Sequence, residues 1–237
     1  MAASPTRDAI VARSLGLPPG FCSNSLLTWE GIGEVTEALQ VTAGESLVDV
    51  GCGRGSYGIE VARRTGACLV GVDFSSVALE QARSDAAREL LAGHARFTIG
   101  TLTATDLPTG SASALMCIDA VQFAEPPLAA LHEFRRLLVP GGRAVLTCWE
   151  AVEASDERVS PRIHAVNLRR DLATAGFAEI EVYDKQRWRD DERRAWQEVL
   201  AAPADPDPAI ESLRSEGRRS LDHFDSLRRV LAIATAP

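Results

Sequence analysis

The sequence predicts an α/β fold built on a doubly wound, mostly parallel sheet. Apolar runs with strand character alternate with helical patterns along most of the chain, and a glycine-rich turn directly follows the first of these runs. The chain has 237 residues, of which 46% are hydrophobic, so it can bury the core of one domain with a small appended cap. We therefore expect a single domain over residues 1–237.

The elements of this sheet follow one another in regular order. Strand signals lie at residues 46–51, 68–73, 95–99, 113–119 and 143–149, with helical patterns between them at 57–65, 75–91 and 127–138. Parallel strands joined in this way need right-handed crossovers, and the ligands of such sheets bind beyond the carboxyl ends of the strands. Gly51, Asp73, the segment after Ile99 and Asp119 all fall at that edge.

The pattern changes in the last third of the chain. A helix near 164–175 and a strand at 178–184 are followed by an amphipathic helix over 187–202. A proline-rich break at 203–208 separates it from a second amphipathic helix, and strand character returns at 229–234. We therefore expect two helices inserted before the last strand.

The run Asp49-Val50-Gly51-Cys52-Gly53-Arg54-Gly55 lies between the first strand and the first helix of the sheet. Glycines tolerate positive φ and let backbone N–H groups approach a ligand with no side chain in the way. The next strand ends in Asp73, 18 residues after Gly55, where a carboxylate can accept hydrogen bonds from a ribose diol. The pattern indicates a nucleotide-cofactor turn.

The glycines alone leave three interpretations open. Gly53 to Gly58 also satisfies G-x-G-x-x-G, and Asp73 lies about 20 residues further on, as a nicotinamide dinucleotide enzyme requires. A tight turn without any ligand is the third possibility. Against the nicotinamide enzyme, neither Tyr57 nor Tyr183 stands four residues before Lys185, the only lysine, so the Tyr-x-x-x-Lys pair of short-chain dehydrogenases is absent.

In the register acid-x-Gly-x-Gly-x-Gly, residues 48–55 resemble motif I of the class I S-adenosylmethionine (SAM) dependent methyltransferases. The acidic strand tip at 71–75, the active-site segment at 119–123 and the helix-to-strand turn at 137–142 are also similar to that family. The resemblance covers about residues 45–184. It implies a Rossmann-like sheet of about seven strands, mostly parallel with the last strand antiparallel, plus a helical cap.

The resemblance also divides the domain and implies a cofactor site. The parts expected are an N-terminal helical lid at 1–44, a SAM-binding core at 45–184, a helical cap insertion at 185–226 and a terminal strand at 227–237. The cofactor is SAM, with S-adenosylhomocysteine (SAH) as product, and the residues implied in binding it are Asp49, Gly51, Cys52, Gly53, Gly55, Asp73, Phe74, Leu102, Thr103 and Asp119. Phe74 either stacks on adenine or plugs the core.

The implied reaction is transfer of a methyl group to an O, N or C atom of a small organic acceptor such as a secondary metabolite. The sulfonium donor is already activated, so positioning and exclusion of water should carry most of the rate. The candidate bases are His164, His223, Asp119 and Glu150, with Gln122 as a residue that orients the acceptor. Trp188, Trp196 and Phe224 are candidates for an aromatic pocket.

Composition narrows the remaining classes. A net charge of −8 argues against a nucleic acid partner, and the absence of an 18-residue apolar run or a signal peptide argues against a membrane and for a cytoplasmic protein. The five cysteines lack the spacing of a metal site, so no metal is expected. The oligomeric state is left open. An NAD(P)-dependent oxidoreductase and a non-catalytic SAM-binding module stay as alternative functions.

Overall fold

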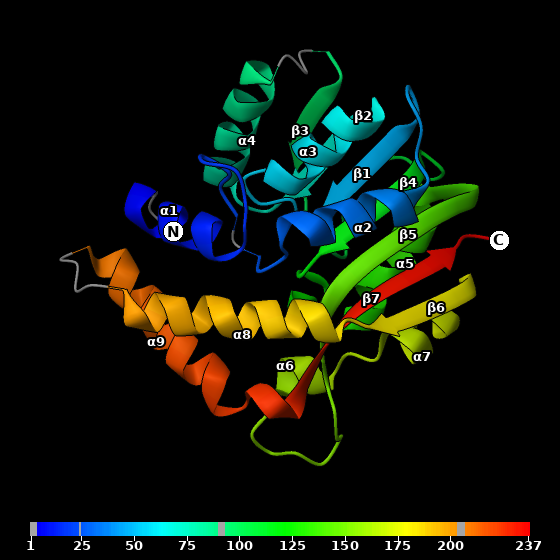
Figure 1. The fold of residues 1–237 in the computed structure, drawn as a ribbon. Coiled ribbons are helices and arrows are strands. Elements are labelled where there is room, and N and C mark those ends of the chain that lie inside the picture. The colour runs from blue at the N-terminus through cyan, green and yellow to red at the C-terminus, as the bar shows by residue number, and fades with distance from the viewer. Residues whose placement is uncertain (1–3, 24, 90–92, 203–206) are drawn as a thin grey trace.

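The computed structural model describes residues 4–23, 25–89, 93–202 and 207–237, and its centre is a seven-stranded sheet of order β3-β2-β1-β4-β5-β7-β6 (Figure 1). The strands are β1 Ser46–Val50, β2 Cys68–Asp73, β3 Ala95–Ile99, β4 Ala112–Ile118, β5 Leu138–Ala151, β6 Ala178–Asp184 and β7 Leu227–Thr235. Strands β1 to β5 pair in parallel, whereas β7 is antiparallel to both of its neighbours. The predicted fold class is confirmed.

Strand β1 lies between β2 and β4, so the chain winds outward in one direction from β1 to β3 and in the other from β4 onward. A crevice forms at such a switch point, beyond the carboxyl ends of the two central strands. Leu47, Val48 and Val50 of β1 are all buried, as expected of a parallel strand covered by helices on both faces. The crevice therefore lies directly above the glycine-rich turn.

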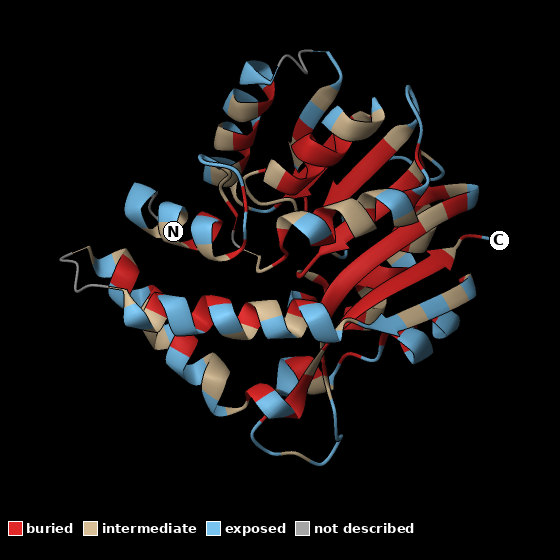
Figure 2. Cartoon of the chain, in the orientation of Figure 1, coloured by how far each residue is buried: buried red, intermediate tan, exposed pale blue. Residues whose placement is uncertain are grey.

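Helices cover both faces of the sheet. They are α1 Pro5–Ser14, α2 Trp29–Leu39, α3 Ser56–Thr65, α4 Ser76–Arg88, α5 Pro127–Leu137, α6 Pro161–His164, α7 Leu168–Thr174, α8 Gln186–Ala201 and α9 Pro208–Asp222, with short 3₁₀ turns η1 Val121–Phe123 and η2 Phe224–Ser226. One hydrophobic cluster joins the sheet to α2, α3 and α4, and a second joins its other face to α5 and α7. Figure 2 shows the buried strands between helices that are buried on one side only.

The expected helix at 164–175 is wrong as a single element, because the chain forms α6 and then α7. Asn167 has extended backbone at this point and its side chain accepts a hydrogen bond from the Arg170 N–H at 2.9 Å. The Asp171 carboxylate in turn accepts from the Asn167 N–H at 2.9 Å. This reciprocal capping starts a new helix at Leu168.

Helices α8 and α9 pack against each other and against α1. Part of the proline-rich break between them, at 203–206, lies outside the described residues, as does the end of the helix expected at 75–91. Trp188 of α8 is fully buried and its indole N–H donates to Glu34 of α2 at 2.7 Å, so it ties α8 to the core rather than lining a pocket. Among the described residues, no helix is long and apolar enough to span a membrane.

Candidate functional site

The glycine-rich turn can bend sharply at the end of β1 because two of its positions, where a side chain would not fit, are occupied by glycine. Gly51 has φ +78°, and a Cβ there would lie 2.7 Å from the Cβ of Ala120. Gly55 also has φ +78°, and its Cβ would meet that of Ala82 at 2.9 Å. Gly55 precedes α3, and its N–H donates to the Cys52 carbonyl at 2.8 Å. The turn thus places the start of α3 at the crevice.

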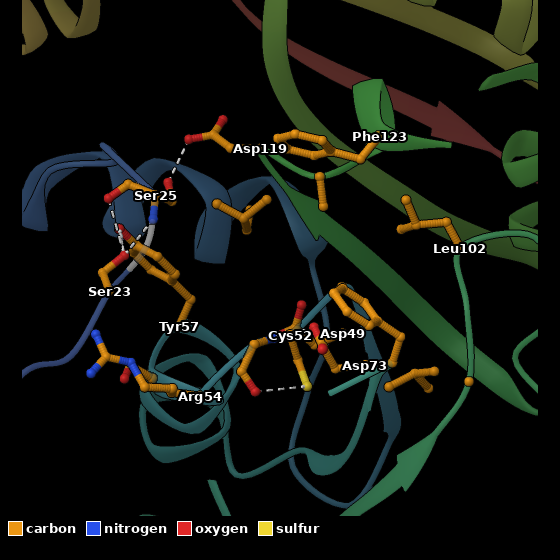
Figure 3. Close-up of a pocket in the computed structure, with 18 of the residues that line it drawn as sticks. Ser23, Ser25, Asp49, Cys52, Arg54, Tyr57, Asp73, Leu102, Asp119 and Phe123 are labelled. Atoms are coloured by element: carbon orange, nitrogen blue, oxygen red, sulfur yellow. Dashed lines mark hydrogen bonds between the residues drawn. The ribbon is translucent and has the colours of Figure 1, made fainter. Parts of the chain in front are cut away.

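A cavity of about 360 Å³ opens above this turn (Figure 3). The residues that were expected to bind a cofactor line it, and they are Asp49, Gly51, Cys52, Gly53, Asp73, Phe74, Leu102 and Asp119. Gly55 and Thr103 do not line it. Gly55 instead serves the packing of the turn, and the neighbouring Thr101 takes the position at the cavity wall.

The Asp73 carboxylate is fixed at the tip of β2 by two backbone groups. Its Oδ2 accepts from the Gly53 N–H at 2.8 Å and its Oδ1 accepts from the Ser75 N–H at 2.9 Å. Each carboxylate oxygen has a second lone pair, so Asp73 can still accept hydrogen bonds from a ligand diol. Its place in the cavity wall fits the ribose of a nucleoside.

Asp49 lies beneath the turn, with 2% of its surface exposed. Burial, and then the nearby charge of Asp73, raise the pKa of Asp49 to about 8, although a hydrogen bond from the Gly58 backbone opposes the shift. A cationic ligand in the cavity would favour the ionised carboxylate and lower this pKa again. Asp49 therefore fits a ligand with a positively charged group.

Phe74 is 79% exposed and lies in the cavity wall, so the interpretation of this residue as a core plug is wrong. An exposed ring beside the tip of β2 offers an apolar face to a flat heterocycle. The turn, Asp73 and Phe74 together fit a nucleoside that carries a charged tail.

The N-terminal segment contributes residues to this cavity that the sequence did not reveal. Ser23 and Ser25 line it, the Ser23 hydroxyl donates to the Tyr57 hydroxyl at 2.8 Å, and that of Ser25 donates to the Asp119 carboxylate. Phe21 and Trp29 of the same segment pack edge to face with ring centroids 5.9 Å apart and do not line this cavity.

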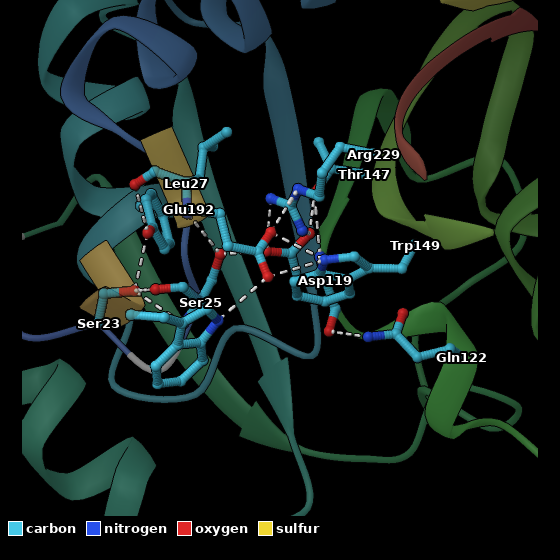
Figure 4. A network of polar contacts seen from close by, with 11 residues as sticks. Ser23, Ser25, Leu27, Asp119, Gln122, Thr147, Trp149, Glu192 and Arg229 are labelled. Atoms are coloured by element: carbon cyan, nitrogen blue, oxygen red, sulfur yellow. Dashed lines mark hydrogen bonds and ion pairs between the residues drawn. The ribbon is translucent and has the colours of Figure 1, made fainter. Parts of the chain in front are cut away.

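Asp119, at the end of β4, is held in a buried network (Figure 4). Arg229 of β7 donates to both of its carboxylate oxygens at 2.8 and 3.0 Å, and the Thr147 hydroxyl donates to Oδ1 at 2.7 Å. With Ser25 as the fourth donor, both carboxylate oxygens have their hydrogen bonds satisfied within the protein. This geometry argues against the prediction that Asp119 is a general base.

A second cavity, of about 390 Å³, meets the first at Ser23, Ser25, Asp119 and Phe123. Its wall combines aromatic and aliphatic side chains, among them Trp149, Trp196, Leu213, Phe224 and Leu227, with polar and charged ones such as Gln122, Glu192 and His223. A cavity that pairs apolar surface with polar groups able to orient a ligand is typical of a small-molecule site. Of the three predicted aromatic residues, Trp196 and Phe224 line it and Trp188 does not.

The other predicted catalytic residues have different surroundings. The Gln122 side-chain amide donates to the Asp119 backbone carbonyl at 2.7 Å, and its Oε1 is buried with no hydrogen-bond partner among the described residues. His223 lines the second cavity. His164 lines neither cavity, and its Nε2 lies 2.8 Å from the Asp156 carbonyl oxygen. Glu150 also lies outside both, where it accepts from the Leu168 N–H at 2.6 Å.

Known sequences resemble the part of the chain that forms the first cavity. Residues 47–142, which hold the turn, Asp73 and Asp119, match the protein family described as a methyltransferase domain. This part of the chain is therefore similar to a methyltransferase domain. It is 32% identical over 114 residues to the ubiquinone biosynthesis O-methyltransferase of Alkalilimnicola ehrlichii, an alignment that covers 48% of this chain and 45% of that protein.

A second relative is the sterol 24-C-methyltransferase of Eremothecium gossypii, 27% identical over 216 residues that cover 82% of this chain and 57% of that one. The chain thus spans about half the length of the curated relatives it matches.

Solved structures share the fold of this chain. The [4+2]-cyclase SpnF superimposes with a TM-score of 0.80 at 22% identity and covers 97% of this chain and 92% of its own. Phosphoethanolamine N-methyltransferase 2 of Haemonchus contortus, in complex with SAM, gives a TM-score of 0.78 at 19% identity, with 99% of this chain and 57% of that one covered. At these identities the likeness establishes the fold alone.

Proposed function

We propose that this chain transfers a methyl group from SAM to a small organic acceptor. The observation that carries the proposal is the junction of two cavities at Ser25, Asp119 and Phe123, beyond the carboxyl ends of β1 and β4. One cavity fits a nucleoside with a charged tail, and the other, lined by both apolar and polar side chains, is large enough for a small molecule. When bound, SAM supplies a methyl group on a positively charged sulfur.

Each part of the first cavity then has a role toward the cofactor. The backbone from Gly51 to Gly53 holds the amino-acid tail, Asp73 accepts from the ribose hydroxyls, and Phe74 covers the adenine. The ammonium of the tail supplies the positive charge that favours ionised Asp49. Asp119 and Ser25 form the wall between donor and acceptor, where exclusion of water matters most.

The helices around the second cavity act as its cover. Ser23 and Ser25 belong to the N-terminal segment expected to form a lid, and Glu192 and Trp196 belong to the cap insertion. An enclosed acceptor cavity of this kind supports catalysis over a non-catalytic SAM-binding module. The net charge of −8 supports a small molecule over a nucleic acid as acceptor. A cytoplasmic location stays a prediction from composition.

A thermal-shift panel with SAM, SAH, NADH and NADPH tests the proposal. A ligand that binds only the native state at about 100 times its Kd adds about 2.7 kcal/mol of stability. We expect SAM and SAH to raise the melting temperature, and NADH and NADPH to leave it unchanged. Gly53→Val is the control: its β-branched side chain at φ +53° blocks the approach of the cofactor to the turn, so the shift should vanish. Stabilisation by NADPH and not by SAM would favour the oxidoreductase.

A further inference from the structure

A buried cluster of two carboxylates and one guanidinium reaches both cavities through Asp119, and the second cavity also through Glu192. Asp119 comes from the end of β4, Glu192 from α8 and Arg229 from β7, and their side chains are 3%, 4% and 1% exposed. With both carboxylates ionised, the cluster carries one negative charge that no buried cation balances among the described residues. An unbalanced charge in such a place favours uptake of a proton.

Arg229 is shared unequally between the two carboxylates. Both terminal nitrogens of the guanidinium donate hydrogen bonds to Asp119. Glu192 faces only the Nε, at 3.6 Å, which is beyond hydrogen-bond distance. The other donors to Glu192 are neutral: the indole N–H of Trp149 at 2.9 Å and that of Trp196 at 3.4 Å. Of the two carboxylates, Glu192 is therefore the one that gains or loses a proton, because Asp119 keeps its counter-charge.

The groups around Glu192 also favour it as the carboxylate that exchanges a proton. Burial raises the pKa of Glu192, Arg229 lowers it, and the charge of Asp119 raises it further. On α8 itself, Arg189 and Arg193 pair with Asp225 instead. The other charged or titratable groups that line this cavity are Arg7 of α1, Arg162 of α6, Glu216 and Arg219 of α9, and His223.

Next to Asp119 and Glu192 the neighbouring donors face these two carboxylates, whereas Arg162, Arg219 and His223 line other parts of the cavity. Ser25, Arg229 and the two indoles already donate to the carboxylates. The Gln122 amide nitrogen is turned to the Asp119 backbone, which leaves its oxygen as a buried acceptor with no partner among the described residues (Figure 4). An acceptor molecule with a hydroxyl at this end would meet complementary groups, and one with an ether or ketone there would not.

We propose that Glu192 is the proton acceptor of this cavity and that the methyl acceptor presents a hydroxyl to it, an inference that rests on the proposed function. The Glu192 carboxylate takes the hydroxyl proton while the oxygen forms a bond to the methyl carbon. The bond from that carbon to sulfur breaks, and its electron pair stays on sulfur as neutral SAH. Glu192 then returns the proton to solvent.

The first test follows the proton directly. Protein labelled with ¹³C at the glutamate side-chain carboxyls, with SAH bound, is titrated by NMR as wild type, Glu192→Gln and Glu198→Gln. Glu198 is an exposed residue of the same helix and serves as the matched control. We expect one resonance to titrate above the usual glutamate range, to be lost in Glu192→Gln and to persist in Glu198→Gln. A resonance that persists in Glu192→Gln, or the absence of any raised midpoint, overturns the proposal.

The second test measures SAH formation with 1-naphthol and with 4-nitrophenol, a more acidic hydroxyl that is largely deprotonated without help from a base. Glu192→Gln should slow transfer to naphthol by about 100-fold or more, at nearly constant KM, and affect nitrophenol much less. An equal loss on both, or no transfer to either by wild type, overturns the role of Glu192. Failure of wild type to bind SAM would instead overturn the proposed function.

Discussion

Replacing Arg229 tests how much the buried ion pairs beside the two cavities stabilise the fold. Arg229→Met keeps an unbranched apolar stem but removes the cation that faces Asp119 and Glu192. Breaking a buried ion pair by removing one partner costs about 3–5 kcal/mol, because the remaining charge is left uncompensated. A protein of this kind has about 5–15 kcal/mol of stability in total, so the loss should be plain in urea denaturation.

The pH dependence separates this charge effect from simple loss of packing. Burial raises the pKa of Glu192, so at about pH 8 the variant must bury an ionised Glu192 without its cation, whereas at about pH 5 this carboxylate more readily takes up a proton. The destabilisation should therefore shrink at the lower pH. Arg218→Met is the control, since its exposed pair with Glu211 at 3.0 Å should contribute about 0–1 kcal/mol. A small or pH-independent loss for Arg229→Met would refute the reasoning.

Three further predictions concern the cavities themselves. Asp73→Ala should weaken SAM binding by about 1.5–3 kcal/mol in calorimetry, because it removes the ribose acceptor; unchanged affinity with a native melting curve would place the ribose elsewhere. Trp196→Ala should cost about 3–5 kcal/mol of stability in urea denaturation while the folded protein keeps its SAM affinity, and an undisturbed stability would contradict its place in the core. Since the pKa of Asp49 rises from 3.8 to about 8 on folding, its contribution to stability is complete below about pH 4 and is lost as pH rises through 8. Asp49→Asn should remove that decline in ligand-free protein, and a variant with the wild-type pH profile would argue against the buried, protonated carboxyl.

Much of the fold follows from local sequence. The strand at 68–73 and the strand at 178–184 have the predicted bounds, because strand-forming runs with turn residues at their ends specify strands with little help from the rest of the chain. The glycine-rich turn is equally local, since the positive φ of Gly51 and Gly55 is a requirement of the backbone.

The second cavity depends on tertiary structure and could not be predicted in the same way. Asp119 and Arg229 are 110 residues apart in sequence, and Trp149 and Glu192 are 43 apart, so no spacing pattern marks them as partners. Arg229 follows Arg228 at the start of an otherwise apolar terminal strand, and this pair of charges was the available signal. No sequence pattern marks Ser25. Its hydrogen bond to Asp119 follows only from the path of the N-terminal segment in the folded chain.

A crystal structure of the protein with SAH tests the central claim most directly. We expect SAH in the first cavity, with its ribose hydroxyls within about 2.6–3.2 Å of the Asp73 carboxylate. Its sulfur should point past Ser25 and Asp119 toward the second cavity. SAH bound with its sulfur away from that junction, or bound outside the first cavity, would contradict a methyl transfer between the two.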